Sequence, residues 1–384
     1  MGIKRKQARI GLLLSGSENW IGGVYYVLNI IRGLNAYKKA GGNFELYVLC
    51  NGQLPSDVYL SLDNLSVAYF RTDNIKIHTK LIRKLKYGQN PYKHISAFVL
   101  ANKIDILYPL LSYSEFHNSI SCKTVYWIPD FQHKILPQFF SQQELDSRDI
   151  QFEAIVCNAK HLILSSNDAL THFKRFYPDS QVKTSLLQFK SIIEKNKLPS
   201  LGTIRLKYDM PESYFMVANQ FWAHKNHKVV LEAILCSKKA GVNVCVVFSG
   251  KPYDKRQPEY FDHLLSFIQA NSLENSVLMV GFIPRLDQLA LMKGSTAVIQ
   301  PSKFEGWSTV IEDAKSLNKI VICSSIAIHQ EQLGDKGIYF EQNDSDGLSK
   351  HLNRLLIINN EKIDFPDFTE EQYGQQLLQI IENA

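Results

Sequence analysis

The stretch VIQPSKFEGWSTVIEDAKSLNKIVICSS, residues 298–325, decides the fold. It reads as a buried apolar strand over residues 297–300, a polar turn, a helix that opens near Thr309, and a second apolar strand over residues 320–324. Two parallel strands of one sheet need a crossover connection, which is usually a helix. The stretch therefore predicts a β-α-β unit, and with it an α/β fold built on parallel sheets.

The turn between the first strand and the helix carries the polar residues of this unit. Thr309 is followed three residues later by Glu312, which is the spacing of a capping box, so we expect the helix to begin at Thr309. The free N–H groups of its first turn then point back towards Glu305 and Ser308, and a helix N-terminus attracts anions. Two interpretations stay open on spacing alone: a seat for a phosphate group, or a turn whose polar residues only cap the helix.

Length and composition indicate a globular protein of two domains. The 384 residues suffice for two full cores, and 45% hydrophobic with 21% charged residues is ordinary for this class. No apolar run approaches the ~18 residues of a membrane span. The N-terminus is basic and then apolar only over residues 10–14, with no small-residue cleavage site, so we interpret it as a strand and not a signal peptide. Six cysteines without a CxxC pair indicate buried thiols in a reducing, cytoplasmic setting.

Positive charge gathers in the first part of the chain. Residues 1–110 contain 15 Lys/Arg against 6 Asp/Glu, although the whole chain carries only +6. Within residues 78–94, apolar positions alternate at helical spacing with Lys80, Arg83, Lys84 and Lys86. Such a face either lies on an anionic membrane surface or is simply solvated, and both interpretations stay open. No nucleic-acid motif accompanies the charge, so nucleic-acid binding is not expected.

Strands and helices alternate in two series. In the first, a strand at 8–14 leads through a loop with Gly22 and Gly23 to a helix at 24–39. The two glycines either let a ligand approach the backbone or form a tight turn, and the loop is not the dinucleotide motif GxGxxG. Further strands are expected at 44–50, 67–70, 104–108, 124–128 and 154–157, and residues 161–177 read as a strand and then a helix from Ser165 or Ser166.

Residues 191–211 have two prolines and no sustained hydrophobic periodicity, and we interpret them as the linker between domains. The second series follows, with strands at 214–218, 243–249 and 277–280 and helices at 229–240, 260–270, 286–293 and, at the end, 368–382. The predicted domains are therefore residues 1–195 and 196–365, with a C-terminal helix in 366–384 that can cross back to the first domain. Both domains have the doubly wound, Rossmann-like α/β pattern.

The turn and its surroundings resemble the donor-binding signature of retaining family 4 glycosyltransferases (glycosyl transferases group 1), which have the GT-B fold. In that family a Glu is followed eight positions on by a second acidic residue. Glu305 matches the first, and Asp313 stands at the second position, one methylene shorter than the usual Glu. The resemblance implies two Rossmann-like domains facing across a cleft, an N-terminal acceptor domain and a C-terminal nucleotide-sugar donor domain.

The resemblance extends to other segments, with departures. ANQFWAHKNHKVVLEAI, residues 218–234, is similar to the family segment in which an Arg and a Lys five residues apart hold the donor diphosphate. Lys225 matches the Lys, but Gln220 stands at the Arg position. WIPDFQHKILPQFFS, residues 127–141, resembles a segment that carries His-Asp in many members; here Pro129 replaces the His and Asp130 is kept.

The resemblance implies a role for each matched position. Glu305 would bind the sugar hydroxyls, Asp313 the ribose hydroxyls, and Lys225 the diphosphate. The catalytic candidates are Glu305, Asp130 and Lys225; the donor-binding candidates are Gly22, Gly23, Gln220, Lys225, Ser308, Thr309 and Asp313. No metal and no cofactor is expected beyond the substrate, a UDP-, GDP- or dTDP-sugar. Lys251 is either a replacement for the missing Arg or a surface lysine.

The implied function is transfer of a hexose or deoxyhexose to a glycan or lipid-linked acceptor in surface polysaccharide or lipopolysaccharide biosynthesis. We expect it in the cytoplasm or peripherally on the inner face of the membrane. Because Pro129 and Gln220 depart from the family pattern, a catalytically degenerate protein of the same fold that binds a glycan or a partner stays open. His224 and His227 have the spacing of zinc ligands but lack Cys or carboxylate partners, so no metal site is expected.

Overall fold

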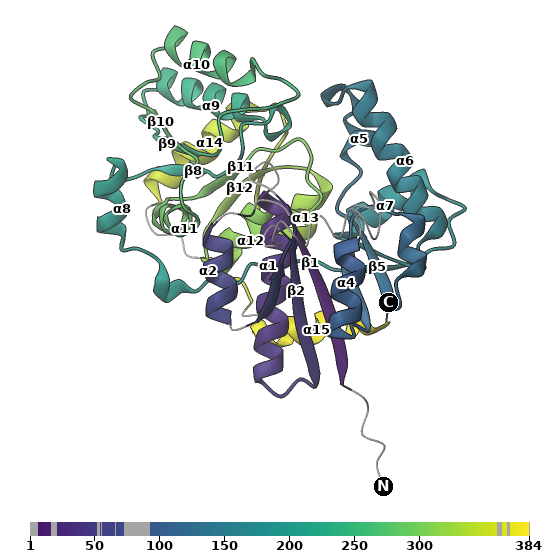
Figure 1. Ribbon diagram of the computed structural model, residues 1–384. Helices are drawn as coiled ribbons and strands as arrows, with labels where there is room; N and C mark the ends of the chain where they lie inside the picture. The colour runs from purple at the N-terminus through teal and green to yellow at the C-terminus, as the bar shows by residue number, and fades with distance from the viewer. Residues whose placement is uncertain are drawn as a thin grey trace. The chain divides into compact units, whose positions relative to one another are not determined.

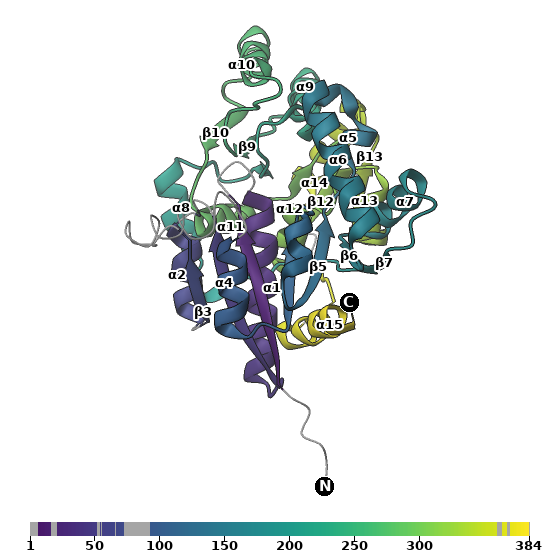
Figure 2. The same ribbon diagram turned by 45° about the vertical axis from the view of Figure 1, so that its right-hand side comes forward.

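The computed structural model describes residues 7–16, 21–51, 54, 56–65, 67–72, 93–358, 363–366 and 369–383 (Figures 1 and 2). The chain divides into two compact units, each built on its own parallel sheet. Unit 1 comprises Met1–Pro129, Asp146–Ile192 and Asp367–Ala384, and unit 2 comprises Asp130–Leu145 and Ile193–Pro366. The basic residues Lys80, Arg83, Lys84 and Lys86 lie outside the described residues.

Unit 1 contains a seven-stranded sheet of order β3-β2-β1-β4-β5-β6-β7. The order reverses between β1 and β4, so this sheet has the switch point of a doubly wound fold. Its strands are β1 (Ala8–Ser15), β2 (Phe44–Asn51), β3 (Ala68–Arg71), β4 (Ile106–Leu110), β5 (Lys123–Ile128), β6 (His161–Leu164) and β7 (Lys183–Leu186). Its helices are α1 (Ile21–Lys39), α2 (Ser56–Leu65), α4 (Lys93–Asn102), most of α6 (Gln142–Asn158), α7 (Asn167–Phe176) and α15 (Glu370–Asn383). Near-continuous burial of β1 and β4 is typical of strands covered on both faces.

The C-terminal helix α15 packs against α1 within unit 1. The two helices approach closely at a pair of glycines, because a Cβ on Gly374 would lie 2.0 Å from the carbonyl oxygen of Gly33. The ring of Tyr373, which is fully buried, lies against Gly33 in the same contact. The last helix of the chain is thus part of the first unit.

Unit 2 contains a six-stranded sheet of order β10-β9-β8-β11-β12-β13. The order reverses again, here between β8 and β11. Its strands are β8 (Phe215–Val217), β9 (Val246–Ser249), β10 (Val277–Gly281), β11 (Val298–Gln300), β12 (Val321–Ser324) and β13 (Ile338–Phe340). Its helices are α5 (Gln132–Ile135), α8 (Leu201–Tyr208), α9 (His227–Lys239), α10 (Tyr260–Ala270), α11 (Arg285–Gly294), α12 (Thr309–Ser316), α13 (Ala327–Leu333) and α14 (Ser345–Ile357).

Alternation along β8 divides the core of unit 2 into two layers. Phe215 and Val217 point to one face of the sheet, and Met216 points to the other, as the two-residue period of a strand requires. The first layer contains buried residues of α9, α10 and α14, and the second contains those of α8, α11, α12 and α13 (Figure 1). Helices therefore cover both faces, and ligand-binding groups are left to the strand ends.

Two sequence predictions of local structure were wrong, and a third, the linker, lacked a helix that the structure shows. Residues 154–157 are not a strand but the end of α6, where Phe152, Ile155 and Val156 are buried at helical spacing; a short apolar run is ambiguous on its own. The expected linker at residues 191–211 contains the division between the two units, after Ile192, but it also contains helix α8, whose N-cap Ser200 accepts a hydrogen bond from the N–H of Thr203 at 3.1 Å. Gly22 and Gly23 lie in the first turn of α1 and not in a loop.

Other local predictions were confirmed in part. Helix α7 begins after Ser166, whose hydroxyl caps it by accepting from the N–H of Ala169 at 2.9 Å. All six cysteines are free, as expected, but Cys157 is exposed and only Cys50 and Cys323 are buried. Among the described helices, none combines the length and apolar character needed to cross a bilayer.

Candidate functional site

The candidate site lies at the switch point of the unit 2 sheet. β8 and β11 are parallel neighbours, with Val298 opposite Met216, so the loops that follow them leave the same edge. After β8 the chain forms a short 3-10 helix, η5 (Ala223–Lys225), and after β11 it forms the turn that contains Glu305. Side chains from two segments about 80 residues apart in sequence meet here.

A chain of buried hydrogen bonds connects the two loops. Asn219 donates from Nδ2 to Oε1 of Gln300 at 3.0 Å, and Gln300 donates from Nε2 to Oε1 of Glu305 at 2.7 Å. Lys225 Nζ reaches the same carboxylate oxygen at 2.6 Å. The side chains of Lys225 and Glu305 are only 13% and 10% exposed. Two donors on one oxygen fix the orientation of the Glu305 carboxylate.

Glu305 keeps its negative charge in this buried position. Burial by itself raises the pKa of Glu305, but the charge and hydrogen bond of Lys225, with further help from Ser302, outweigh it and leave the pKa below the ordinary value. The site therefore presents a carboxylate, which only accepts hydrogen bonds, beside an ammonium group, which only donates them. This pair can hold a ligand that has both hydroxyl groups and an anionic group.

Helix α12 begins at Thr309, as predicted, but its N-cap is Ser308 and not Thr309. The hydroxyl of Ser308 accepts from the N–H of Ile311 at 3.3 Å, and the N–H of Ser308 donates to Oε1 of Gln332 at 2.9 Å. Glu312 accepts from Lys315 and Gln332. Among the described residues, the N–H of Thr309 finds no acceptor within the chain. The predicted anion seat is thus available at Thr309, while the N–H of Ser308 is already engaged.

Asp313 is only 1% exposed and forms an ion pair with Nη2 of Arg285. Arg285 also donates from Nη1 to Oε1 of Gln288 at 3.0 Å, and Gln288 donates to the hydroxyl of Ser249 at 3.2 Å. These contacts connect α12 through α11 to the carboxyl end of β9. Sequence reasoning missed Arg285, because its partner lies 28 residues away and no motif joins the two.

Gln220 does not replace the charge of an Arg but fastens two loops together. Its Oε1 accepts from the N–H of Lys251 at 3.0 Å, and the N–H of Phe221 donates to the carbonyl of Lys251 at 3.2 Å. Gly250 makes this approach possible, because a Cβ there would lie 2.0 Å from the carbonyl oxygen of Asn219. The backbone of Lys251 is thereby placed beside the Gln220 amide.

Asp130 begins the segment Asp130–Leu145, which packs with unit 2. Asp130 accepts from the N–H of Gln132 at 2.9 Å, which fixes its side chain at the start of α5. Further along this segment, the ring of Phe139 lies 6.3 Å from that of His224, the neighbour of Lys225. The segment thus contacts the η5 loop. Gly22 and Gly23 belong to unit 1, and their contact with a ligand stays a prediction.

His227, the first residue of α9 after η5, does not form a ligand site. His227 is fully buried and stacks on Phe221 with ring centres 4.5 Å apart, and burial lowers its pKa to about 3, so it is a core histidine. In the described part of the chain, no three His, Cys, Asp or Glu side chains are grouped to hold a metal ion.

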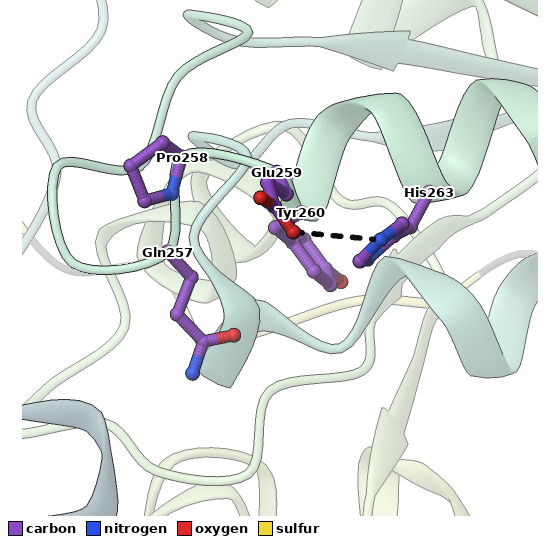
Figure 3. Close-up of a pocket in the computed structure, with 5 residues that line it drawn as sticks. All are labelled: Gln257, Pro258, Glu259, Tyr260 and His263. Carbon is purple, nitrogen blue, oxygen red and sulfur yellow. Dashed lines mark ion pairs between the residues drawn. The ribbon is translucent and has the colours of Figure 1, made fainter.

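A pocket of about 290 Å³ lies at the start of α10 (Figure 3). It is lined by Gln257, Pro258, Glu259, Tyr260 and His263, and Nε2 of His263 lies 3.9 Å from Oε2 of Glu259, with both side chains exposed. None of the predicted site residues lines this pocket. We therefore place the candidate site at Lys225 and Glu305.

Residues 205–367 match the family described as "Glycosyl transferases group 1". The match covers less than half of the chain, and we call the matched residues the group 1 domain. The group 1 domain includes Lys225, Glu305, Arg285 and Asp313. Over 95 residues the chain is 29% identical to the O-antigen chain mannosyltransferase B of Escherichia coli. These residues make up 25% of each protein. The chain thus matches about a quarter of the length of this curated relative.

The whole chain has the GT-B fold. A glycosyltransferase from Rickettsia africae ESF-5 superimposes with a TM-score of 0.64 at 15% identity, covering 98% of this chain and 94% of the other. Anabaena Alr3699/HepE in complex with UDP superimposes with a TM-score of 0.63 at 15% identity, covering 98% of each chain. Two doubly wound domains, predicted from the sequence, are thereby confirmed as this architecture, with the group 1 domain as the second.

Proposed function

We propose that this protein is a retaining glycosyltransferase that moves a sugar from a nucleotide-sugar donor to a glycan or lipid-linked acceptor. The observation that carries this proposal is the buried Lys225–Glu305 pair at the switch point of a group 1 domain. The pair offers a cation for a phosphate and an acceptor for hydroxyl groups within one hydrogen bond of each other. A nucleotide sugar carries both of these groups.

In the proposed reaction the nucleoside diphosphate leaves while an acceptor hydroxyl attacks the same face of the sugar. Negative charge develops on the leaving phosphate and positive charge on the sugar, so fixed charges at these two places stabilise the transition state. Lys225 and the N-terminus of α12 at Thr309 would neutralise the phosphate. Glu305 would hold sugar hydroxyl groups and stabilise the developing positive charge. We propose that this transfer proceeds without a metal ion.

The nucleoside end of the donor is proposed to lie near Asp313 and Arg285. The carboxylate of Asp313 is covered by the guanidinium group, whose side chain is 17% exposed against 1% for Asp313. We therefore expect the ribose to meet Asp313 through Arg285 and not directly. Asp130 and the segment that follows it are proposed to act on the acceptor side of the reaction, with unit 1 as the acceptor domain.

A role in surface polysaccharide or lipopolysaccharide biosynthesis is supported by the similarity to the O-antigen chain mannosyltransferase B. Peripheral binding to an anionic membrane through Lys80, Arg83, Lys84 and Lys86 is proposed from the sequence alone. Flotation with liposomes tests it, and binding should weaken when these four residues are neutralised.

A second candidate function is a binding protein of the same fold without turnover. Gln220 favours it, because this side chain fastens a loop and supplies no charge to a diphosphate. The missing charge-assisted contact corresponds to about 1.5–3 kcal/mol of donor binding.

Nucleotide release by the purified protein separates the two candidates. UDP-, GDP- and dTDP-sugars are each incubated with and without acceptor glycans, and the released nucleoside diphosphate is measured. The enzyme proposal predicts release that depends on one donor and increases with acceptor. Nucleotide binding without any release would favour the binding protein. The enzyme proposal would be excluded if no donor showed either binding or release.

A further inference from the structure

Helix α13 directs two polar side chains towards the turn that contains Glu305. His329 and Gln332 are three residues apart and so lie on one face of the helix. Gln332 exchanges two hydrogen bonds with the backbone of Ser308, at 2.9 and 3.1 Å. His329, one turn earlier, is fully buried and close enough to Glu305 for each to influence the pKa of the other. No sequence motif drew attention to His329.

The structure fixes the tautomer of His329. Its Nδ1 lies 2.9 Å from the carbonyl oxygen of Ser324, and because a carbonyl only accepts, Nδ1 carries the proton. The hydroxyl of Ser324 donates in turn to the carbonyl of Ser302 at 2.5 Å, which ties this arrangement to the turn after β11. Burial lowers the pKa of His329 to about 4, so the ring is neutral near pH 7 and Nε2 is an acceptor.

Nε2 of His329 is buried, and among the described residues no group donates a hydrogen bond to it. A buried acceptor without a donor lowers stability, and native proteins keep such groups mainly where a ligand or a water pairs with them. Its neighbour Glu305 is also only an acceptor. A ligand that satisfies both must bring O–H donors. The diphosphate within a nucleotide sugar, which carries no proton at neutral pH, cannot do so, but the sugar hydroxyl groups can.

We propose that His329 is a sugar-binding residue, whose Nε2 accepts a hydrogen bond from a hydroxyl of the donor sugar while Glu305 accepts from another. This inference rests on the proposed function and names a residue for the sugar end of the donor. Other groups bind the nucleotide end of the donor. A substitution of His329 should therefore change the affinity for the nucleotide sugar and not the affinity for the nucleoside diphosphate.

The test compares His329→Phe with a matched control, His161→Phe. His161 is also buried, also has one ring nitrogen paired with a serine hydroxyl (Ser185, 3.0 Å), and has its pKa lowered to about 4. It lies at the amino end of β6, in unit 1, away from the ligand edge of its sheet. Affinities for the nucleotide sugar and for its free nucleoside diphosphate are measured for both variants and the wild type.

His329→Phe should weaken binding of the nucleotide sugar by about three- to tenfold and leave binding of the free nucleoside diphosphate unchanged. His161→Phe should change neither. Equal losses for both ligands, or no loss for the nucleotide sugar, would overturn the inference, because a structural histidine cannot distinguish the two.

A second measurement does not depend on the stability of the variant. The Nε2 signal of His329 is followed by ¹⁵N NMR in wild-type protein labelled at histidine, and is assigned with His329→Gln or His329→Phe. It should move when the nucleotide sugar binds and stay in place with the nucleoside diphosphate. A nucleotide sugar that binds without moving it would show that a fixed water is the partner, and would overturn the inference for His329 alone. If no nucleotide or nucleotide sugar binds, the proposed function fails and this inference fails with it.

Discussion

The two sheets have the same strand order around their switch points, but the side chains found there differ. In unit 1, Tyr26 of α1 makes a 2.5 Å hydrogen bond to the hydroxyl of Tyr108 in β4, and its ring stacks on Trp127 at 3.9 Å. In unit 2 the corresponding loops place Lys225 and Glu305 in a buried ion pair. Among the described residues, the side chains that we find at the first switch point are neutral and aromatic, and those at the second are charged.

This difference shows why the fold alone does not locate the chemistry. Burial raises the pKa of Tyr26 and Tyr108, so both hydroxyls stay neutral and add only packing and one hydrogen bond. In unit 2, desolvating an ammonium and a carboxylate is expensive, and buried ionisable groups at the ligand edge of a sheet are candidates for a functional site. The charged switch point is therefore the better candidate for donor binding.

Breaking the ion pair should have the largest effect. Lys225→Met leaves a buried carboxylate without its cation and should lower the free energy of unfolding by about 3–5 kcal/mol. The control Lys228→Met removes a pair with Glu232 that is 63% and 34% exposed, and should cost at most about 1 kcal/mol. Urea unfolding measures both. Similar losses in the two variants would show that the buried pair has no special role.

The same variant should reverse the pH dependence of stability. In the wild type the pKa of Glu305 is below its ordinary value, so the contribution of this group to stability is present above the unfolded-state pKa and is lost as the pH falls through the folded-state pKa. Without Lys225, burial dominates and raises the pKa of Glu305. Stability of Lys225→Met should then decrease as the pH rises through that value.

Glu305→Gln tests catalysis at the charged switch point. It keeps the shape of the side chain but removes the charge that stabilises the sugar, and transfer should fall by about 100-fold or more. Glu259→Gln, in the pocket of Figure 3, is the matched control and should keep wild-type activity. Initial rates at saturating donor measure both. Full activity of Glu305→Gln would show that the carboxylate of Glu305 is not needed for catalysis.

Arg285→Met tests the nucleoside end of the donor. If the guanidinium group connects Asp313 to the ribose, affinity for nucleoside diphosphates should fall by about tenfold, because a charge-assisted hydrogen bond is lost. Isothermal titration calorimetry gives the affinity. Were Asp313 to bind the ribose directly, uncovering it would leave the affinity unchanged or increase it.

Tyr26→Phe tests the aromatic switch point of unit 1 and should have the smallest effect of the substitutions at the two switch points. It leaves the buried hydroxyl of Tyr108 without its partner, so stability should decrease by about 1–2 kcal/mol. Donor affinity should not change. A loss of donor affinity together with wild-type stability would mean that the aromatic switch point also binds the donor.

Local sequence patterns were sufficient for the parts of the site that lie within one β-α-β unit. The spacing of Thr309 and Glu312 predicted the first residue of α12, and the resemblance to a known family indicated Glu305 and Asp313. Lys225 was found because its segment, residues 218–234, resembles a segment of the same family. The prediction of a strand at 154–157 was wrong because four apolar residues fit either a strand or one face of a helix. The preceding residues of α6 are needed to distinguish the two.

The residues that complete the site come from elsewhere in the chain. Arg285, Gln332 and His329 reach their partners Asp313, Ser308 and Ser324 only after α11 and α13 have packed, and each is an ordinary helix residue in the sequence. Gln220 was expected to mark a lost phosphate contact, and only the structure shows that it fastens the loop at Lys251. Contacts between segments thus depend on tertiary packing, which spacing alone does not reveal.

The most direct test of the central claim is binding of UDP, GDP and dTDP to the wild type and to Lys225→Met. Isothermal titration calorimetry is done at a temperature at which both proteins are folded, with thermal shift as a second readout of ligand-linked stability. We predict that at least one nucleoside diphosphate binds the wild type and that Lys225→Met weakens this binding by about tenfold or more, because a charge-assisted contact to phosphate is lost. Binding of none of the three, or equal binding by both proteins, would contradict a donor site at the switch point of unit 2.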